Sequence, residues 1–182
     1  YKPGNNHFIT QLLKESKEKV SYKHAQRDAD NRIIKLEKFK QDIPESTIEF
    51  TYNVSGYLSK RKVIDEGLVQ EFIYTYDADN LMKIEEYKDA VLKSTLLMEY
   101  DINRFNSVVI DLFDVKQVGF ITDTQFGKQS KNLVKSIKAV IPNEQVGIAF
   151  QYIYKTDTDG CVKSIEIKNR DEVLKKYNLI FQ

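Results

Sequence analysis

The 182-residue chain has no tryptophan, one cysteine, three prolines and seven glycines. A single cysteine excludes an internal disulfide framework and every zinc site built from several cysteines. Lys and Arg total 28 against 27 for Asp and Glu, so no excess positive charge attracts nucleic acid or an anionic membrane surface. No apolar run is long enough for a transmembrane helix. We therefore expect one soluble globular domain over residues 1–182.

The composition favours β-structure, because 11 tyrosines and 10 phenylalanines fit a pleated surface well. A short signature recurs in which an aromatic residue and an Asp or Asn precede turn-forming residues. Tyr52, Tyr76 and Tyr100 of three copies follow one another at intervals of 24 residues. The copies span residues 50–56, 74–80, 98–104 and 154–160, and an earlier copy ends in Asp28-Ala29-Asp30-Asn31.

Each copy predicts a strand that ends in a hairpin turn. Ile48, Phe50 and Tyr52 alternate with polar neighbours, and a period of two indicates a half-buried strand. The Asp, Asn and Gly residues that follow favour a tight reversal into a second strand. Apolar spacings of three just after the turn, such as Ile33 with Leu36, predict a β-bulge there.

About a dozen such strands give an all-β fold, an antiparallel meander of hairpin repeats. A sheet of that many strands curls or closes, so we predict a long curled sheet or a soluble barrel. Residues 8–14 would also suit one helical stripe, but the phase of the repeat favours a strand. After the third copy, Phe105 to Phe113 is the expected second strand of its hairpin.

The regular pattern fails at about 114–131, where apolar residues lack steady alternation. This run is too long for a hairpin turn and too apolar for a solvated linker. We expect a packed excursion, irregular or with one short helix, that covers an open end of the sheet. Strands are predicted to resume at 133–140 and 146–156.

The aromatic-x-Tyr-Asp-x-x-Gly turn followed by a strand resembles the YD repeats of large secreted bacterial proteins. Over about residues 8–181 the chain is also similar to a Bacteroidetes-type family of lipoproteins of unknown function, described as having a porin-like fold. In that family similar hairpins break into an apolar excursion and resume with a Lys-Asn-apolar-apolar-x-x-Ile strand, here residues 131–137. Two copies depart from the pattern, with Arg104 in place of the glycine and Arg27 in place of the second aromatic.

The resemblance implies export to the periplasm or the outer-membrane surface. It further implies an anchor through a lipidated cysteine upstream of Tyr1, which would be the chain's membrane contact, and a curved antiparallel sheet. It implies no activity and contributes no catalytic or cofactor-binding residues.

One turn has the spacing of a calcium loop. Asp157, Asp159 and Gly160 would take its third, fifth and sixth positions. The first position would be Lys155, a cation where the loop requires a carboxylate, so a plain turn is the favoured interpretation. The same turn-capping role is expected for the paired acids Asp28, Asp30, Asp77 and Asp79.

Other catalytic and metal-binding patterns find little support. His7 and His24 have no acidic or cysteine neighbour at ligand spacing, and nothing beside Cys161 would depress its pKa. No phosphate-binding glycine loop or nucleophile elbow is present. We therefore predict no enzyme activity, no metal and no cofactor; a hydrolase built on two facing carboxylates is a third hypothesis.

The column formed by Tyr52, Tyr76 and Tyr100 supplies the candidate ligand-contact residues. Stacked on neighbouring hairpins, these rings would suit a sugar face or an extended peptide. The competing interpretation places them in the core, with the hydroxyl groups reaching water at the rim. The leading hypothesis is an exported, non-enzymatic domain that binds an extracellular or envelope ligand, with a glycan as one candidate. The alternative is a structural protein or a carrier of an apolar molecule.

Overall fold

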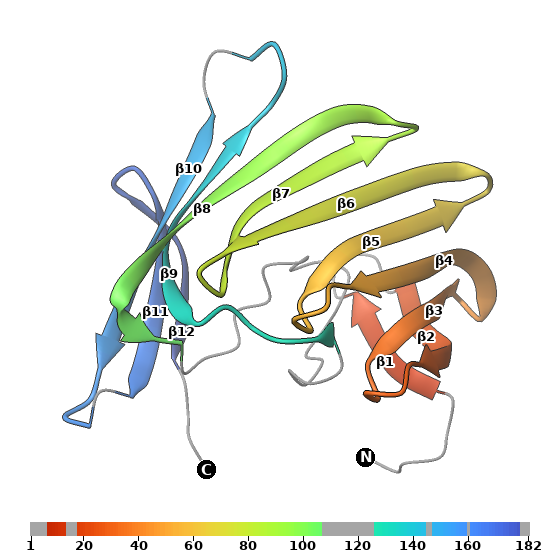
Figure 1. Cartoon of the computed structure of the whole chain (residues 1–182), viewed down its shortest axis with the longest axis horizontal. Helices are drawn as coiled ribbons and strands as arrows, with labels where there is room; N and C mark the ends of the chain where they lie inside the picture. Colours follow the sequence, from red (N-terminus) through yellow and green to blue (C-terminus); the bar gives the residue numbers. More distant parts are fainter. Residues whose placement is uncertain (1–6, 14–17, 107–125, 145–146, 160, 179–182) are drawn as a thin grey trace. The chain divides into compact units, whose positions relative to one another are not determined.

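The structure is a computed structural model that describes residues 7–13, 18–106, 126–144, 147–159 and 161–178. Its strands form an antiparallel meander in which each is hydrogen-bonded to its neighbours in the chain, in the order β1 to β12 (Figure 1). The predicted all-β meander, and a strand rather than a helix near the N-terminus, are thereby confirmed. The strands are β1 (His7–Leu13), β2 (Glu18–Arg27), β3 (Ile33–Lys40), β4 (Ile43–Tyr52), β5 (Leu58–Asp65), β6 (Leu68–Asp77), β7 (Asn80–Lys88), β8 (Val91–Phe105), β9 (Asn132–Val140), β10 (Ile148–Thr156), β11 (Val162–Asn169) and β12 (Glu172–Asn178).

The chain divides into two compact units, which are described separately below. Unit 1 comprises Tyr1–Ile73, Tyr87–Val91 and Asp111–Lys128, and unit 2 comprises Tyr74–Glu86, Leu92–Ile110 and Gln129–Gln182. The single domain over residues 1–182 stays a prediction. No helix among the described residues has the length and apolarity needed to cross a membrane.

The predicted alternation sorts the side chains of unit 1 onto two faces. On one face Leu36, Ile48 and Phe50 are buried, with at most 7% of their surface exposed. Burying each such side chain contributes about 1.5–3 kcal/mol. The opposite face carries opposite charges on adjacent strands, because the register places the residues Lys35, Glu49, Lys62 and Glu71 in one row across β3 to β6. Alternating charge keeps this face in water and favours the observed register.

The hairpins of unit 1 reverse through two kinds of turn, one at each end of the strands. At one end the turns have two residues, both with positive φ, as type I′ turns require. These pairs are Gln41-Asp42, Glu66-Gly67 and Asp89-Ala90. At the other end longer turns close with a left-handed residue, Asn31 (φ 63°) or Gly56 (φ 88°). The register shifts next to them, for example between Thr51 and Tyr52, so the predicted β-bulge is confirmed.

The third copy of the signature is not a hairpin turn, and this prediction was wrong. Residues 101–104 lie inside β8, which runs from Val91 to Phe105 without reversing. The register jumps from Asp101 opposite Leu133 to Phe105 opposite Asn132, so the intervening residues form a bulge. Arg104 occupies the place of the left-handed Asn31 and Gly56 in the turns of unit 1, a conformation that arginine adopts at a cost. The partner of β8 is therefore β9; residues 107–113 of the predicted strand lie outside the described residues.

The predicted excursion at about 114–131 is described from Phe126 onward, and residues 114–125 lie outside the described residues. In unit 1 the ring of Phe126 packs on Phe50 with ring centroids 4.9 Å apart, and the Lys128 amide donates to the Gly56 carbonyl (3.0 Å). In unit 2 the Lys131 amide donates to the Asp79 carbonyl (3.0 Å). The described end is thus packed against hairpin turns, as an apolar excursion requires.

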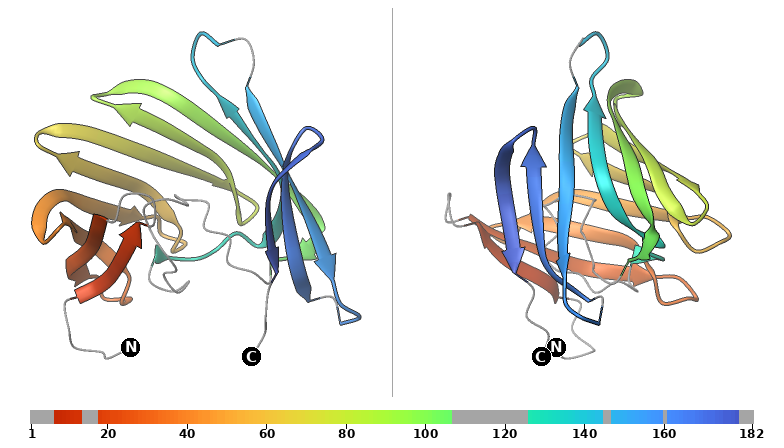
Figure 2. Two further views of the ribbon diagram at one scale, coloured as in Figure 1. Left: turned by 180° about the vertical axis from the view of Figure 1, so that it is seen from behind. Right: turned by 90° about the vertical axis from the view of Figure 1, so that its left-hand side faces the viewer.

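Unit 2 has its own apolar cluster on the strands that resume after the excursion. Strands β9 to β12 lie side by side in both views (Figure 2). Leu133, Val162 and Ile165 are buried, and Tyr152 and Tyr154 pack against them. The predicted strands at 133–140 and 146–156 are confirmed as β9 and β10.

Candidate functional site

Two of the candidate tyrosines, Tyr52 and Tyr100, donate their hydroxyl groups to backbone carbonyls of earlier strands. In unit 1 the Tyr52 hydroxyl donates to the carbonyl oxygen of Ile33 (2.7 Å). In unit 2 the Tyr100 hydroxyl donates to the Leu81 carbonyl (2.8 Å) and lies 3.0 Å from the Ser130 hydroxyl. Tyr76, in unit 2, occupies the equivalent place at the end of β6 and is half-buried. Each bond reaches back 19 residues, so the contact recurs with the repeat.

A third tyrosine makes the same contact, and the sequence argument did not name it as a candidate site residue. The Tyr154 hydroxyl donates to the Val134 carbonyl (2.7 Å), reaching back 20 residues. Its signal was present in the sequence, because Tyr154 opens the 154–160 copy of the signature. Burial raises the pKa of Tyr52, Tyr100 and Tyr154 above the ordinary tyrosine value.

These contacts assign the tyrosines a structural role in the meander. Each half-buried ring spans from one strand to the start of an earlier one, and its hydroxyl satisfies a backbone carbonyl rather than reaching water. Two further groups lie against the Tyr52 ring. The Arg32 guanidinium carbon is 4.6 Å from the ring centroid, and Gly127 lies close to the ring. Ligand contact by Tyr52, Tyr76 and Tyr100 stays a prediction.

Replacing a bonded tyrosine with phenylalanine should destabilise its unit while the fold is retained. For Tyr52→Phe, Tyr100→Phe and Tyr154→Phe we expect a loss of about 1–2 kcal/mol each, since a carbonyl is left without its donor. Tyr87→Phe is the control, because the Tyr87 hydroxyl bonds to no described residue. Urea unfolding gives the free energy of unfolding of the four variants. An equal loss of stability for Tyr87→Phe would refute the structural role of the hydroxyl bonds.

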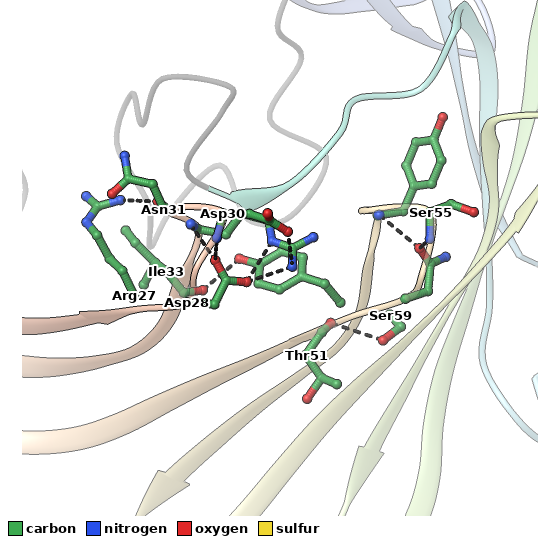
Figure 3. A network of polar contacts seen from close by, with 12 residues as sticks. Arg27, Asp28, Asp30, Asn31, Ile33, Thr51, Ser55 and Ser59 are labelled. Carbon is green, nitrogen blue, oxygen red and sulfur yellow. Dashed lines mark hydrogen bonds and ion pairs between the residues drawn. The ribbon is translucent and has the colours of Figure 1, made fainter.

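Asp28 caps its turn, as predicted, whereas the same role for Asp30, Asp77 and Asp79 stays a prediction. In unit 1 one carboxylate oxygen of Asp28 accepts from the Asp30 amide (3.0 Å) and the Arg32 amide (2.9 Å) (Figure 3). Its other oxygen accepts from the Arg32 guanidinium (2.7 Å). Burial alone would raise the pKa of Asp28, but the backbone and side-chain hydrogen bonds of Arg32 and its charge bring this pKa below the ordinary value.

The same cap recurs at two other turns, including the one with calcium-loop spacing. The Asn53 side-chain oxygen accepts from the amides of Ser55 and Tyr57, both at 3.0 Å. Asp157 accepts from the amides of Asp159 (3.0 Å) and Cys161 (2.8 Å), as the cap of a plain turn does. Across the described part of the chain no three His, Cys, Asp or Glu side chains gather as metal ligands.

A hollow of about 200 Å³ opens in unit 1 at the two-residue-turn end of the strands. Hydrogen bonds fix its rim, because the Val69 amide donates to the Asp89 carboxylate (3.1 Å) and the Asp89 amide donates to the Val69 carbonyl (2.9 Å). The Lys38 ammonium lies 2.8 Å from the Glu45 carboxylate. The hollow is lined by Lys38, Ser46, Val63, Asp65, Leu68, Val69, Gln70 and Lys88.

The lining can hold a small polar molecule. It offers a hydroxyl, an amide, a carboxylate and ammonium groups beside Leu68, an aliphatic side chain that is 52% exposed. The volume is below the roughly 300–1,000 Å³ of sites for drug-sized ligands, so it suits one ring-sized group. Among the described residues that line it there is no histidine or cysteine. Sequence reasoning missed this site because its residues come from five strands and carry no motif.

Comparisons with known proteins add little to this description. The sequence matches no family model and no curated protein. Among solved structures, the chain is similar to a porin-like protein from Bacteroides uniformis, with a TM-score of 0.34 and 13% sequence identity over 92% of each chain. The resemblance to YD repeats and to a lipoprotein family therefore stays a prediction.

Proposed function

We infer that this protein is a non-enzymatic binding domain whose ligand is a small polyhydroxylated group, such as the end of a glycan. The observation that carries the inference is the hollow in unit 1. Ser46, Asp65 and Gln70 supply donors and acceptors for hydroxyl groups, and Leu68 supplies an apolar surface for the carbon-bound hydrogens of a sugar ring. Tyr52 of the same unit does not line the hollow, and its hydroxyl group is bonded to the Ile33 carbonyl.

The proposal includes export to the cell envelope with a lipid anchor upstream of Tyr1. The YD-like signature supports export, because it resembles repeats of secreted bacterial proteins. A single cysteine and a net charge of +1 are compatible with that setting and give no reason to expect a nucleic-acid partner. In this setting the ligand would be extracellular or part of the envelope.

The proposal predicts that polar substitutions in the hollow weaken binding without unfolding the protein. A glycan array should identify a bound sugar, and titration calorimetry should give its Kd. Asp65→Asn combined with Gln70→Ala is expected to raise that Kd roughly tenfold to a hundredfold, because two hydrogen bonds are lost, one of them to a charged group.

A matched double variant in unit 2 is the control for removing one carboxylate charge and one side-chain amide. Asp171 and Gln151 are exposed and lie outside the hollow, so Asp171→Asn with Gln151→Ala should leave the Kd unchanged. Equal effects of the two double variants would reject the hollow as the site. If the protein binds no glycan on the array, the sugar ligand is rejected and the structural or carrier alternative is favoured.

A further inference from the structure

A buried arginine in unit 1 has a charge that no described carboxylate balances. Arg61, in β5, is 4% exposed, and its Nε atom has no hydrogen-bond partner. Its guanidinium carbon lies 4.1 Å from the centroid of the Phe72 ring on β6. On its other side the register places Arg61 opposite Phe50 of β4, whose ring packs on Phe126. The cation is therefore set among aromatic rings.

An unpaired cation at this position is expensive. Removing a guanidinium from water costs far more than removing an apolar side chain, and proteins normally offset this cost with a carboxylate or several acceptors. The face of the Phe72 ring offsets part of it through a cation–π interaction, but a ring accepts no hydrogen bond from Nε in the plane of the guanidinium. Apolar residues of similar size would fill the same space at lower cost, so stability of unit 1 does not explain the charge.

Arg61 lies on the same face of β5 as one of the residues that line the hollow. Val63, two residues further along β5, lines the hollow, and side chains two residues apart in a strand share a face. The two residues are separated by about 7 Å along the strand, which an arginine side chain can span. The described lining has its polar groups near the turn, and the Arg61 guanidinium lies over the Phe72 ring, further from the turn on the same face.

We propose that Arg61 is the anion receptor of this site and that the ligand carries a carboxylate, as a uronic acid does. This inference rests on the proposed function and specifies its substrate class. A guanidinium binds a carboxylate through two parallel N–H···O bonds, and one positive charge matches one negative charge. A phosphate monoester, with a charge of about −1.5 to −2, would keep an uncompensated charge among the rings.

Paired sugars test the carboxylate directly. Titration calorimetry should show glucuronate binding about tenfold or more tightly than glucose, which lacks the carboxylate. Arg61→Gln should abolish that difference. If glucose binds as tightly as glucuronate, the proposal that the ligand carries a carboxylate is overturned, but the proposed function is not. Binding of neither sugar would overturn both.

A stability measurement on the ligand-free protein tests the unpaired charge separately. If the Arg61 charge is balanced only by ligand, Arg61→Met should raise Tm by several degrees, because an unpaired buried cation is replaced by an apolar side chain of similar length. Lys135→Met, which removes an exposed cation in unit 2, is the control and should leave Tm nearly unchanged. A fall in Tm of several degrees for Arg61→Met would show that a carboxylate of the chain itself pairs with Arg61, and would overturn the proposal.

Discussion

Replacing Gly127 with alanine is expected to destabilise unit 1 by about 2–4 kcal/mol. A Cβ atom at this position would lie 2.6 Å from the Gly56 carbonyl oxygen and 3.0 Å from two ring carbons of Tyr52. Neither neighbour can move freely, because the Gly56 carbonyl accepts from the Lys128 amide and the Tyr52 hydroxyl is bonded to Ile33. The backbone of Gly127 is also left-handed (φ 85°), which adds strain for any other residue.

Gly67 provides a control that separates the two causes. Its φ of 86° is almost the same, but a Cβ atom there would meet nothing within 4 Å. Gly67→Ala should therefore cost only the backbone strain, about 1–2 kcal/mol. Chemical unfolding of both variants measures the difference. Equal costs would show that the close approach of Gly127 to the turn at 53–57 contributes nothing to stability.

The second large effect is expected at a buried pair of amides in unit 2. The Asn80 side chain donates to the Asn132 side-chain oxygen (3.0 Å) and accepts from the Asn132 backbone amide (2.9 Å). Asn132 also donates to the carbonyls of Ile102 (3.2 Å) and Arg104 (3.1 Å) in the bulge of β8. Asn132→Leu keeps the branched shape of the side chain and removes its hydrogen bonds, so we expect a loss of about 2–4 kcal/mol.

A double-mutant cycle distinguishes the pair from its surroundings. Asn80→Leu alone also leaves a buried amide partner unsatisfied, whereas the double variant removes both polar side chains together. The double variant should therefore be more stable than the sum of the single losses predicts, by about 1–2 kcal/mol. Thermal and urea unfolding give the coupling energy. Additive losses would mean that the two amides do not act as a pair.

The repeat was the part of the fold that the sequence could predict, because its signals are local. Alternation of apolar and polar residues fixes which face of a strand is buried, and it placed Ile48 and Phe50 correctly in the core. Asp28, Asn53 and Asp157 cap their turns through amides two and four residues later, so their role follows from short spacings. The hollow and Arg61 could not be predicted in this way, since they depend on which residues neighbouring strands place side by side.

Two identical tetrapeptides form different turns, so the local sequence alone does not determine the turn conformation. Asp-Ala-Asp-Asn occurs at 28–31 and at 77–80, and both copies reverse the chain. In the first, only Asn31 has a positive φ and Asp28 caps the turn with Arg32. In the second, Ala78 and Asp79 have positive φ (44° and 66°), and the Asn80 side chain is buried against Asn132.

The amino-acid sequence by itself determined that this chain folds as strands joined by tight turns, and which side chains face the core. Strand periodicity and turn capping act over a few residues, so neighbours in the chain suffice to set them. Only the tertiary structure decided the form of the turn at 77–80 and the bulge in place of a turn at 101–104, as well as the pairing of β8 with β9. Asn132, 52 residues beyond Asn80, makes buried hydrogen bonds at both sites, and the cost of leaving such groups unpaired outweighs the local preference of either segment.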